Sequence, residues 1–193
     1  MVATSGLSSA ASMLVSNLVD VSFAAPKGGG LELMGSSYKA MIGYLDPGVA
    51  LSTTDTFTTI SSNWLSAGEI VFASGDAAGY DGYFSGQVVF NDGKGLAGKD
   101  LTVWVTDGDL VNFVLTASGA PPVKFLPDAA IPNENAALIA QSNLADWTTR
   151  LGNFDPAANG GLGAYVANDA IPETSTAILG ALGALGLLRR RRI

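Results

Sequence analysis

The chain has 193 residues, of which 48% are hydrophobic and 14% are charged, and its formal net charge is −7. This length suits one globular domain, and the composition is neither that of a coiled coil nor that of a disordered acidic linker. The absence of cysteine excludes disulfides, thiolate nucleophiles, zinc ribbons and iron–sulfur clusters. The absence of histidine excludes triads with an imidazole base and histidine-ligated metal sites. The remaining possibilities are catalysis by carboxylate groups and no catalysis at all.

The charges are distributed unevenly. Residues 1 to 171 contain six Lys or Arg against sixteen Asp or Glu, whereas Arg189 to Arg192 form a block near the C-terminus. An acidic surface repels phosphate backbones, and the chain has no basic patch interleaved with aromatic residues. We therefore expect no nucleic-acid partner, and such a surface suits a protein outside the cytoplasm.

Residues 1 to 25 leave two interpretations open. Phe23-Ala24-Ala25 resembles a signal-peptide cleavage site, but no Lys or Arg precedes the apolar residues, and Asp20 interrupts them. Leu14 to Phe23 is therefore interpreted as a first strand in preference to the remnant of an export signal. A wrongly chosen start codon is a further explanation.

From Leu31 to about Leu126, most of the chain has the two-residue alternation typical of β-strands. Clusters of Gly, Asp and Asn separate the runs and favour turns. The predicted strands are Tyr38 to Leu45, Glu69 to Ala73, Tyr83 to Phe90, Leu101 to Thr106 and Val111 to Ala117.

The last two of these strands are predicted to pair as an antiparallel hairpin. Asp107-Gly108 lies between them, and Asp-Gly is a strong hairpin signal because glycine accepts a positive φ. In the first strand of this hairpin, one face is expected to be buried, and it carries Leu101, Val103 and Val105.

Two segments, residues 55–68 and 133–154, break the β pattern and are predicted to be amphipathic helices that cover a sheet. Each has apolar residues at helical spacing, followed by a glycine that can end the helix. The first set is Phe57, Ile60 and Trp64, with Gly68. The second set is Leu144, Trp147 and Leu151, with Gly152. The predicted fold is mainly β: an antiparallel β-sandwich with two short helices, followed by a C-terminal hydrophobic helix.

The β-rich globular domain is predicted to span residues 26 to 168. Residues 155 to 170 are rich in Gly, Ala and Asn, so they are interpreted as a last strand or as a linker. Residues 169 to 193 form a separate C-terminal signal.

Acidic residues in turns are candidate calcium ligands, because calcium prefers clustered oxygen atoms. The pairs are Asp76 with Asp81, Asn91 with Asp92, and Asp107 with Asp109. None has the spacing of an EF-hand loop, and Asp and Asn are common in turns because they bond the local backbone. No metal and no cofactor is predicted.

A carbohydrate-binding module is an alternative function, because Trp104 and Trp147 could stack on sugar rings. Both lie in elements with apolar periodicity, however, so core packing is the preferred interpretation. A surface glycan hydrolase is a second alternative, which needs two carboxylates about 5 to 10 Å apart. Nothing selects such a pair among thirteen Asp and four Glu, so no catalytic residue is predicted and we expect no enzyme.

The stretch IPETSTAILGALGALGLLRRRRI, residues 171–193, is the most specific feature of the sequence. Ala177 to Leu188 is a run of twelve uncharged residues, about 18 Å long as a helix, against a bilayer core of about 30 Å. Counting back to Thr174 gives about fifteen residues, enough for a partial span. The arginines that follow match the positive-inside pattern, which puts them in the cytoplasm and the acidic domain outside.

This tail resembles the PEP-CTERM sorting signal of bacterial surface proteins. The resemblance implies that exosortase, a membrane protease-transpeptidase, cleaves near Pro172-Glu173 while the apolar run holds the chain in the inner membrane. The implied sorting motif is Pro172, Glu173 and Thr174, where Thr174 replaces the family's second proline. The implied membrane segment contains Ala177, Ile178, Leu179, Leu182, Leu185, Leu187 and Leu188. The implied positive stop is Arg189, Arg190, Arg191 and Arg192.

Short motifs in the domain also resemble uncharacterised domains of PEP-CTERM proteins. They are Ile42-Gly43-Tyr44, Phe84-Ser85-Gly86, Leu96 to Lys99 before LTVWVT, and Phe125 to Asp128. The resemblance implies an exported protein that is in the inner membrane during sorting and then at the cell surface or in the extracellular matrix. The implied partners are exosortase, the inner membrane and exopolysaccharide, and no catalytic activity is expected.

Overall fold

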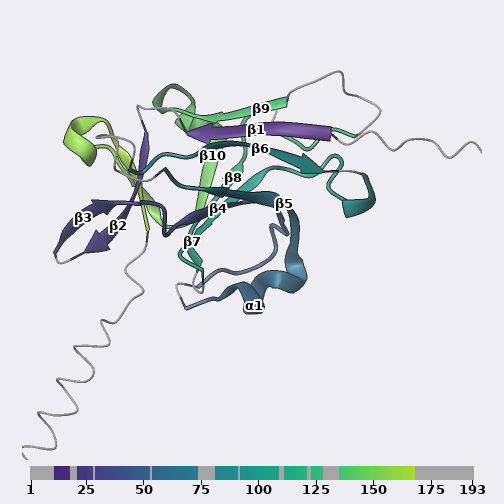
Figure 1. Ribbon diagram of the computed structural model, residues 1–193, viewed down its shortest axis with the longest axis horizontal. Helices are drawn as coiled ribbons and strands as arrows, with labels where there is room; N and C mark the ends of the chain where they lie inside the picture. Colours follow the sequence, from purple (N-terminus) through teal and green to yellow (C-terminus); the bar gives the residue numbers. More distant parts are fainter. Residues whose placement is uncertain are drawn as a thin grey trace, which may run out of the picture.

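Figure 1 shows the computed structural model, which describes residues 11–17, 21–27, 29–52, 54–73, 81–90, 92–108, 111–120, 123–127 and 135–167. The described part is mainly β, with three sheets and only short helical turns. The prediction of a mainly β domain is confirmed.

The largest sheet has five strands in the order β10-β8-β7-β4-β5. These strands are β4 (Lys39–Leu45), β5 (Trp64–Val71), β7 (Thr102–Thr106), β8 (Val111–Ala117) and β10 (Trp147–Leu151). All neighbours in this sheet are antiparallel. The predicted hairpin between β7 and β8 is confirmed, because Val103 lies opposite Leu115 in an antiparallel pair.

Two smaller sheets complete the described part. The three-stranded sheet has the order β6-β1-β9, with β1 (Ala11–Asn17), β6 (Ser85–Phe90) and β9 (Asn135–Ile139). The four-stranded sheet has the order β11-β12-β2-β3, with β2 (Ser22–Lys27), β3 (Gly30–Leu33), β11 (Asn153–Asp155) and β12 (Ala164–Val166). Most strand pairs are antiparallel, but β1 pairs with β9 and β12 pairs with β2 in parallel.

The main hydrophobic core lies between the three-stranded and five-stranded sheets (Figure 1). Met13 of β1 and Val103 of β7 are fully buried in this cluster. Phe23 of β2 joins the third sheet to it, since its ring centroid lies 5.4 Å from that of Phe113 in β8. The segment predicted as one strand, Leu14 to Phe23, contributes to two strands in different sheets.

The first predicted helix, residues 55–68, is wrong for most of its length. Helical structure is limited to α1 (Phe57–Ile60) and the 3-10 turn η1 (Ser61–Asn63), and Trp64 begins strand β5. Threonine and serine have low helix propensity, and only four residues of this Thr- and Ser-rich stretch stay α-helical. The strand predicted at Glu69 to Ala73 overlaps β5 only at residues 69–71, because β5 begins at Trp64 and ends at Val71.

The second predicted helix, residues 133–154, is wrong as well. Strand β9, the 3-10 turn η4 (Gln141–Asp146) and strand β10 occupy this region. A β-bulge between Thr149 and Leu151 puts Trp147 in the main core and Leu151 on the opposite face of the sheet. Their four-residue spacing therefore does not mark one face of a helix.

Both faces of β7 are buried, whereas the sequence predicted one buried face. On the second face, Trp104 is fully buried and meets Trp64 edge to face at 5.5 Å between ring centroids. Val49, Leu51 and Ile60, from the connection between β4 and β5, pack on this second cluster. The connection between β4 and β5 thus covers Trp104 on this second face of the sheet.

Arg150 of β10 holds this connection against the sheet. Its guanidinium donates hydrogen bonds to the carbonyl oxygens of Asp46, Pro47 and Val49 at 3.1, 3.3 and 2.7 Å. Burial lowers the pKa of Arg150, and the nearby Asp46 carboxylate opposes that shift. One charged donor thereby connects three backbone carbonyls of the connection to strand β10.

Candidate functional site

The predicted sorting motif, membrane segment and arginine block, residues 172 to 192, lie outside the described residues. Within the described ranges, no helix has the length and hydropathy needed to cross a membrane. The last described strand, β12, pairs with β2, and the Ala167 amide donates a hydrogen bond to the Ala24 carbonyl at 2.9 Å. The end of the described domain is therefore fixed to the fold just before the predicted signal.

The two tryptophans predicted as candidate sugar platforms are buried. Trp104 is 0% exposed and Trp147 is 7% exposed, so neither offers a free ring face to a ligand. Trp64 is also buried, at 6% exposure. The core-packing interpretation of Trp104 and Trp147 is confirmed, and the tryptophan version of a carbohydrate site is wrong.

The acidic turns provide no metal centre in the described part of the chain, which contains no group of three or more potential metal-ligating side chains. Asp76, Asn91 and Asp109 lie outside that part. At the β7–β8 turn, Asn112 Oδ1 accepts a hydrogen bond from the Asp107 amide at 2.9 Å. The side chains of Asn112 and Thr106 therefore bond the backbone of this turn, as turn chemistry predicts.

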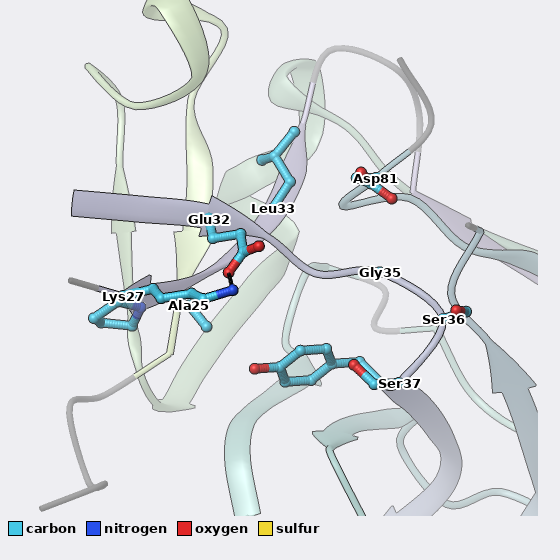
Figure 2. A pocket seen from close by; sticks show the side chains of 10 residues that line it. Ala25, Lys27, Glu32, Leu33, Gly35, Ser36, Ser37 and Asp81 are labelled. Atoms are coloured by element: carbon cyan, nitrogen blue, oxygen red, sulfur yellow. Dashed lines mark ion pairs between the residues drawn. The ribbon is translucent and has the colours of Figure 1, made fainter. Parts of the chain in front are cut away.

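A pocket of about 480 Å³ lies beside the β2–β3 hairpin (Figure 2). This volume falls in the range of about 300 to 1,000 Å³ that is usual for small-molecule sites. Its lining residues come from the hairpin, the turn before β4 and the turn before β6: Ala25, Pro26, Lys27, Glu32, Leu33, Gly35, Ser36, Ser37, Tyr38 and Asp81. It is the candidate functional site of the described residues.

The hairpin side of the pocket is built on a glycine turn. Gly29 has a φ of +83°, which brings Lys27 opposite Gly30 and Ala25 opposite Glu32. Lys27 and Glu32 form an ion pair across the strands, drawn as a dashed line in Figure 2. Their side chains are 70% and 55% exposed, so the pair contributes little to stability, and both charged groups face solvent.

Tyr38 gives the pocket an aromatic ring and a hydroxyl. The Tyr38 amide donates to the Gly35 carbonyl at 3.0 Å, and the Tyr38 carbonyl accepts from the Phe72 amide at 3.1 Å. Burial raises the pKa of Tyr38, the carboxylates of Asp107 and Glu32 raise it further, and Lys27 opposes them. The phenol therefore keeps its proton at neutral pH and can donate a hydrogen bond.

Asp81 lies on the opposite side of the pocket from the Lys27–Glu32 pair (Figure 2). A Cβ atom on Gly35 would lie 3.4 Å from Asp81 Oδ1, so the carboxylate lies against this glycine. The next residue, Gly82, donates its amide to the Met34 carbonyl at 2.7 Å. These contacts hold Asp81 beside the turn that carries Tyr38.

The sequence alone does not reveal this pocket. It marks Asp81 only as a turn partner of Asp76, and Tyr38 only as the start of a strand. The glycines between Lys27 and Glu32 are a local hairpin signal, but no spacing links them to Asp81. The pocket arises from tertiary contacts between segments that are far apart in the chain.

The pocket lining combines hydroxyl, carboxylate, ammonium and apolar groups, which is suited to binding a polar ligand and includes no nucleophile of an established catalytic pattern. The resemblance of residues 172–192 to a sorting signal remains a prediction from the tail sequence. Comparisons of the chain with protein-family models, with curated proteins and with solved structures give no match.

Proposed function

We propose that the chain is an exported bacterial protein that exosortase sorts to the cell surface or to the exopolysaccharide matrix. In this proposal the β-rich domain is a β-sandwich without catalytic activity, and the tail holds the chain transiently in the inner membrane. The observation that carries the proposal is the order of Pro172-Glu173, an uncharged apolar run and four arginines. The three parts would serve in turn as a cleavage mark, a membrane stop and a topological signal.

The architecture of the domain is compatible with removal of the tail. The parallel β12–β2 pair ends at Val166, and Ala167 makes the last described backbone hydrogen bond. Cleavage near Pro172-Glu173 would remove no described strand. The processed protein would therefore keep the three hydrophobic clusters of the described residues and the pocket.

The test follows the full chain in a bacterium that has an exosortase and in the same bacterium without it. We expect a shortened chain only when exosortase is present, with a new C-terminus near Pro172-Glu173 by mass spectrometry. Replacing the four arginines by aspartates is expected to abolish orientation and processing. Replacing them by lysines, the matched control, is expected to preserve both. Equal processing of the aspartate variant and the original chain would contradict the proposal.

A carbohydrate-binding module is a second candidate function, favoured by the pocket beside the β2–β3 hairpin. A hydrolase is less well supported, although Glu32 and Asp81 both line this pocket. Glu32 is engaged by Lys27, and a glycosidase needs one carboxyl group that can donate a proton. Binding without cleavage is therefore the preferred chemistry for the pocket.

A further inference from the structure

We propose that the pocket beside the β2–β3 hairpin binds a neutral saccharide unit of a polysaccharide, with Tyr38, Glu32 and Asp81 as its main contacts. This inference rests on the proposed function for access of the protein to its ligand. The site itself is defined by the described residues alone. In this proposal the pocket is the carbohydrate-binding surface, and the buried tryptophans are not.

The lining matches the chemistry of a sugar. Each sugar hydroxyl both donates and accepts hydrogen bonds, and the pocket offers both kinds of partner. Glu32 and Asp81 supply acceptor oxygens, Lys27 supplies donors, and the Tyr38 hydroxyl supplies either. Leu33 adds apolar surface for the C–H groups of a sugar ring.

The charges of the pocket favour a neutral ligand. The lining contains two carboxylates, Glu32 and Asp81, and one ammonium, Lys27, which is already paired with Glu32. A phosphate, sulfate or uronate group would therefore meet net repulsion, and Asp107 adds a further negative charge near Tyr38. A divalent cation is a poorer occupant, because the described residues contain no group of three ligating side chains.

Tyr38 is the aromatic residue that the pocket makes available. The three tryptophans are buried in two of the hydrophobic clusters, whereas Tyr38 is half-buried and lines the pocket. A half-buried ring is fixed by packing on one side and can contact a ligand on the other. The protonated hydroxyl then orients a bound sugar by one hydrogen bond.

The pocket is held in shape before a ligand arrives. The Tyr38–Gly35 backbone bond closes the turn, and Asn17 Nδ2 donates to the Gly82 carbonyl at 2.9 Å next to Asp81. A ligand therefore does not have to order these backbones when it binds, which lowers the entropic cost of binding.

The test measures binding of short neutral oligosaccharides of glucose, galactose and mannose to the purified full chain by calorimetry. Oligogalacturonate is the anionic comparison. We expect at least one neutral oligosaccharide to bind, and oligogalacturonate to bind about tenfold more weakly or not at all. Tyr38→Phe is expected to weaken neutral binding by about threefold to tenfold, and Glu32→Gln by about tenfold.

Matched controls use groups of the same kind outside the pocket. Glu69→Gln removes an exposed carboxylate that pairs with Lys39 at 2.9 Å, as Glu32 pairs with Lys27. Tyr44→Phe removes a phenol hydroxyl from a tyrosine that does not line the pocket. Both controls are expected to bind like the original chain.

Three results would overturn the inference: no neutral oligosaccharide in the set binds, oligogalacturonate binds more tightly than the neutral sugars, or the pocket variants and their controls bind equally. Release of reducing ends during the titration would assign hydrolysis to the site and also overturn binding without cleavage. The sorting proposal is tested separately, because Tyr38→Phe and Glu32→Gln are expected to leave C-terminal processing unchanged. Normal glycan binding with no processing would contradict the sorting proposal alone.

Discussion

Asn17 and Gly82 are joined by a buried hydrogen bond, in which Asn17 Nδ2 donates to the Gly82 carbonyl at 2.9 Å across 65 residues of sequence. The same amide donates to the Val21 carbonyl at 2.7 Å, and Asn17 Oδ1 accepts from the Phe84 amide at 2.7 Å. Asn17 is 4% exposed, so water cannot replace these partners. One side chain thus fixes the end of β1, the entry to β2 and the turn that carries Asp81.

Asn17→Ala is expected to lower the free energy of unfolding by about 2 to 4 kcal/mol, because it removes three buried hydrogen bonds, including those to the Val21 carbonyl and the Phe84 amide. Urea denaturation measures the change. Gln87→Ala is the matched control, since Gln87 makes one exposed hydrogen bond to Ser12 at 2.8 Å, and it should cost less than about 1 kcal/mol. Similar losses for the two variants would show that the Asn17 network is not a major source of stability.

Arg150→Met is expected to loosen the connection between β4 and β5 and to destabilise the fold by about 1 to 3 kcal/mol. The variant loses the hydrogen bonds from the guanidinium to the carbonyl oxygens of Asp46, Pro47 and Val49. Because that connection covers Trp104, we also expect stronger quenching of tryptophan fluorescence by acrylamide. Lys39→Met, which removes an exposed ion pair, should change neither quantity appreciably. If acrylamide quenches the tryptophan fluorescence of Arg150→Met and of the original chain equally, Arg150 does not hold the connection over Trp104.

Gly43→Ala is expected to destabilise the fold by about 3 kcal/mol or more, because the added methyl group has no room. It would collide with the Leu65 carbonyl oxygen and would lie 2.7 Å from Cζ2 of Trp64. Gly30→Ala adds the same methyl group where the nearest atom is 3.9 Å away, and it should change stability by less than about 1 kcal/mol. Thermal unfolding of the two variants checks this; equal melting temperatures would refute the packing argument.

Alkaline pH is expected to destabilise the fold through Tyr165. Burial raises the pKa of this phenol from 10.0 to about 12. Because the folded-state pKa is the higher one, the contribution is fully present below pH 10 and is lost as the pH rises toward 12. Tyr165→Phe should therefore show a shallower loss of stability between pH 10 and 12, measured by denaturation at each pH. The same slope in both proteins would mean that Tyr165 does not cause the alkaline loss.

The mainly β class and the β7–β8 hairpin could be predicted from local chemistry. Alternation in LTVWVT and the Asp-Gly turn after it act over a few residues, and the observed β8 has the predicted bounds, Val111–Ala117. The two predicted helices are wrong for a related reason. Three-to-four spacing of large apolar residues also occurs in strands that are interrupted by turns and bulges, as Trp147 and Leu151 show.

The absence of Cys and His, the acidic balance and the tripartite tail are readable directly from the residues, because they depend on composition and order alone. Tertiary structure decided which aromatic residues are available to a ligand. The residues next to Trp104 in sequence do not show that both faces of its strand are buried, and it is covered because the distant Arg150 holds a connection over it. The pocket likewise exists because the β2–β3 hairpin, Tyr38 and Asp81 meet in space, and contacts across such sequence distances leave no local pattern.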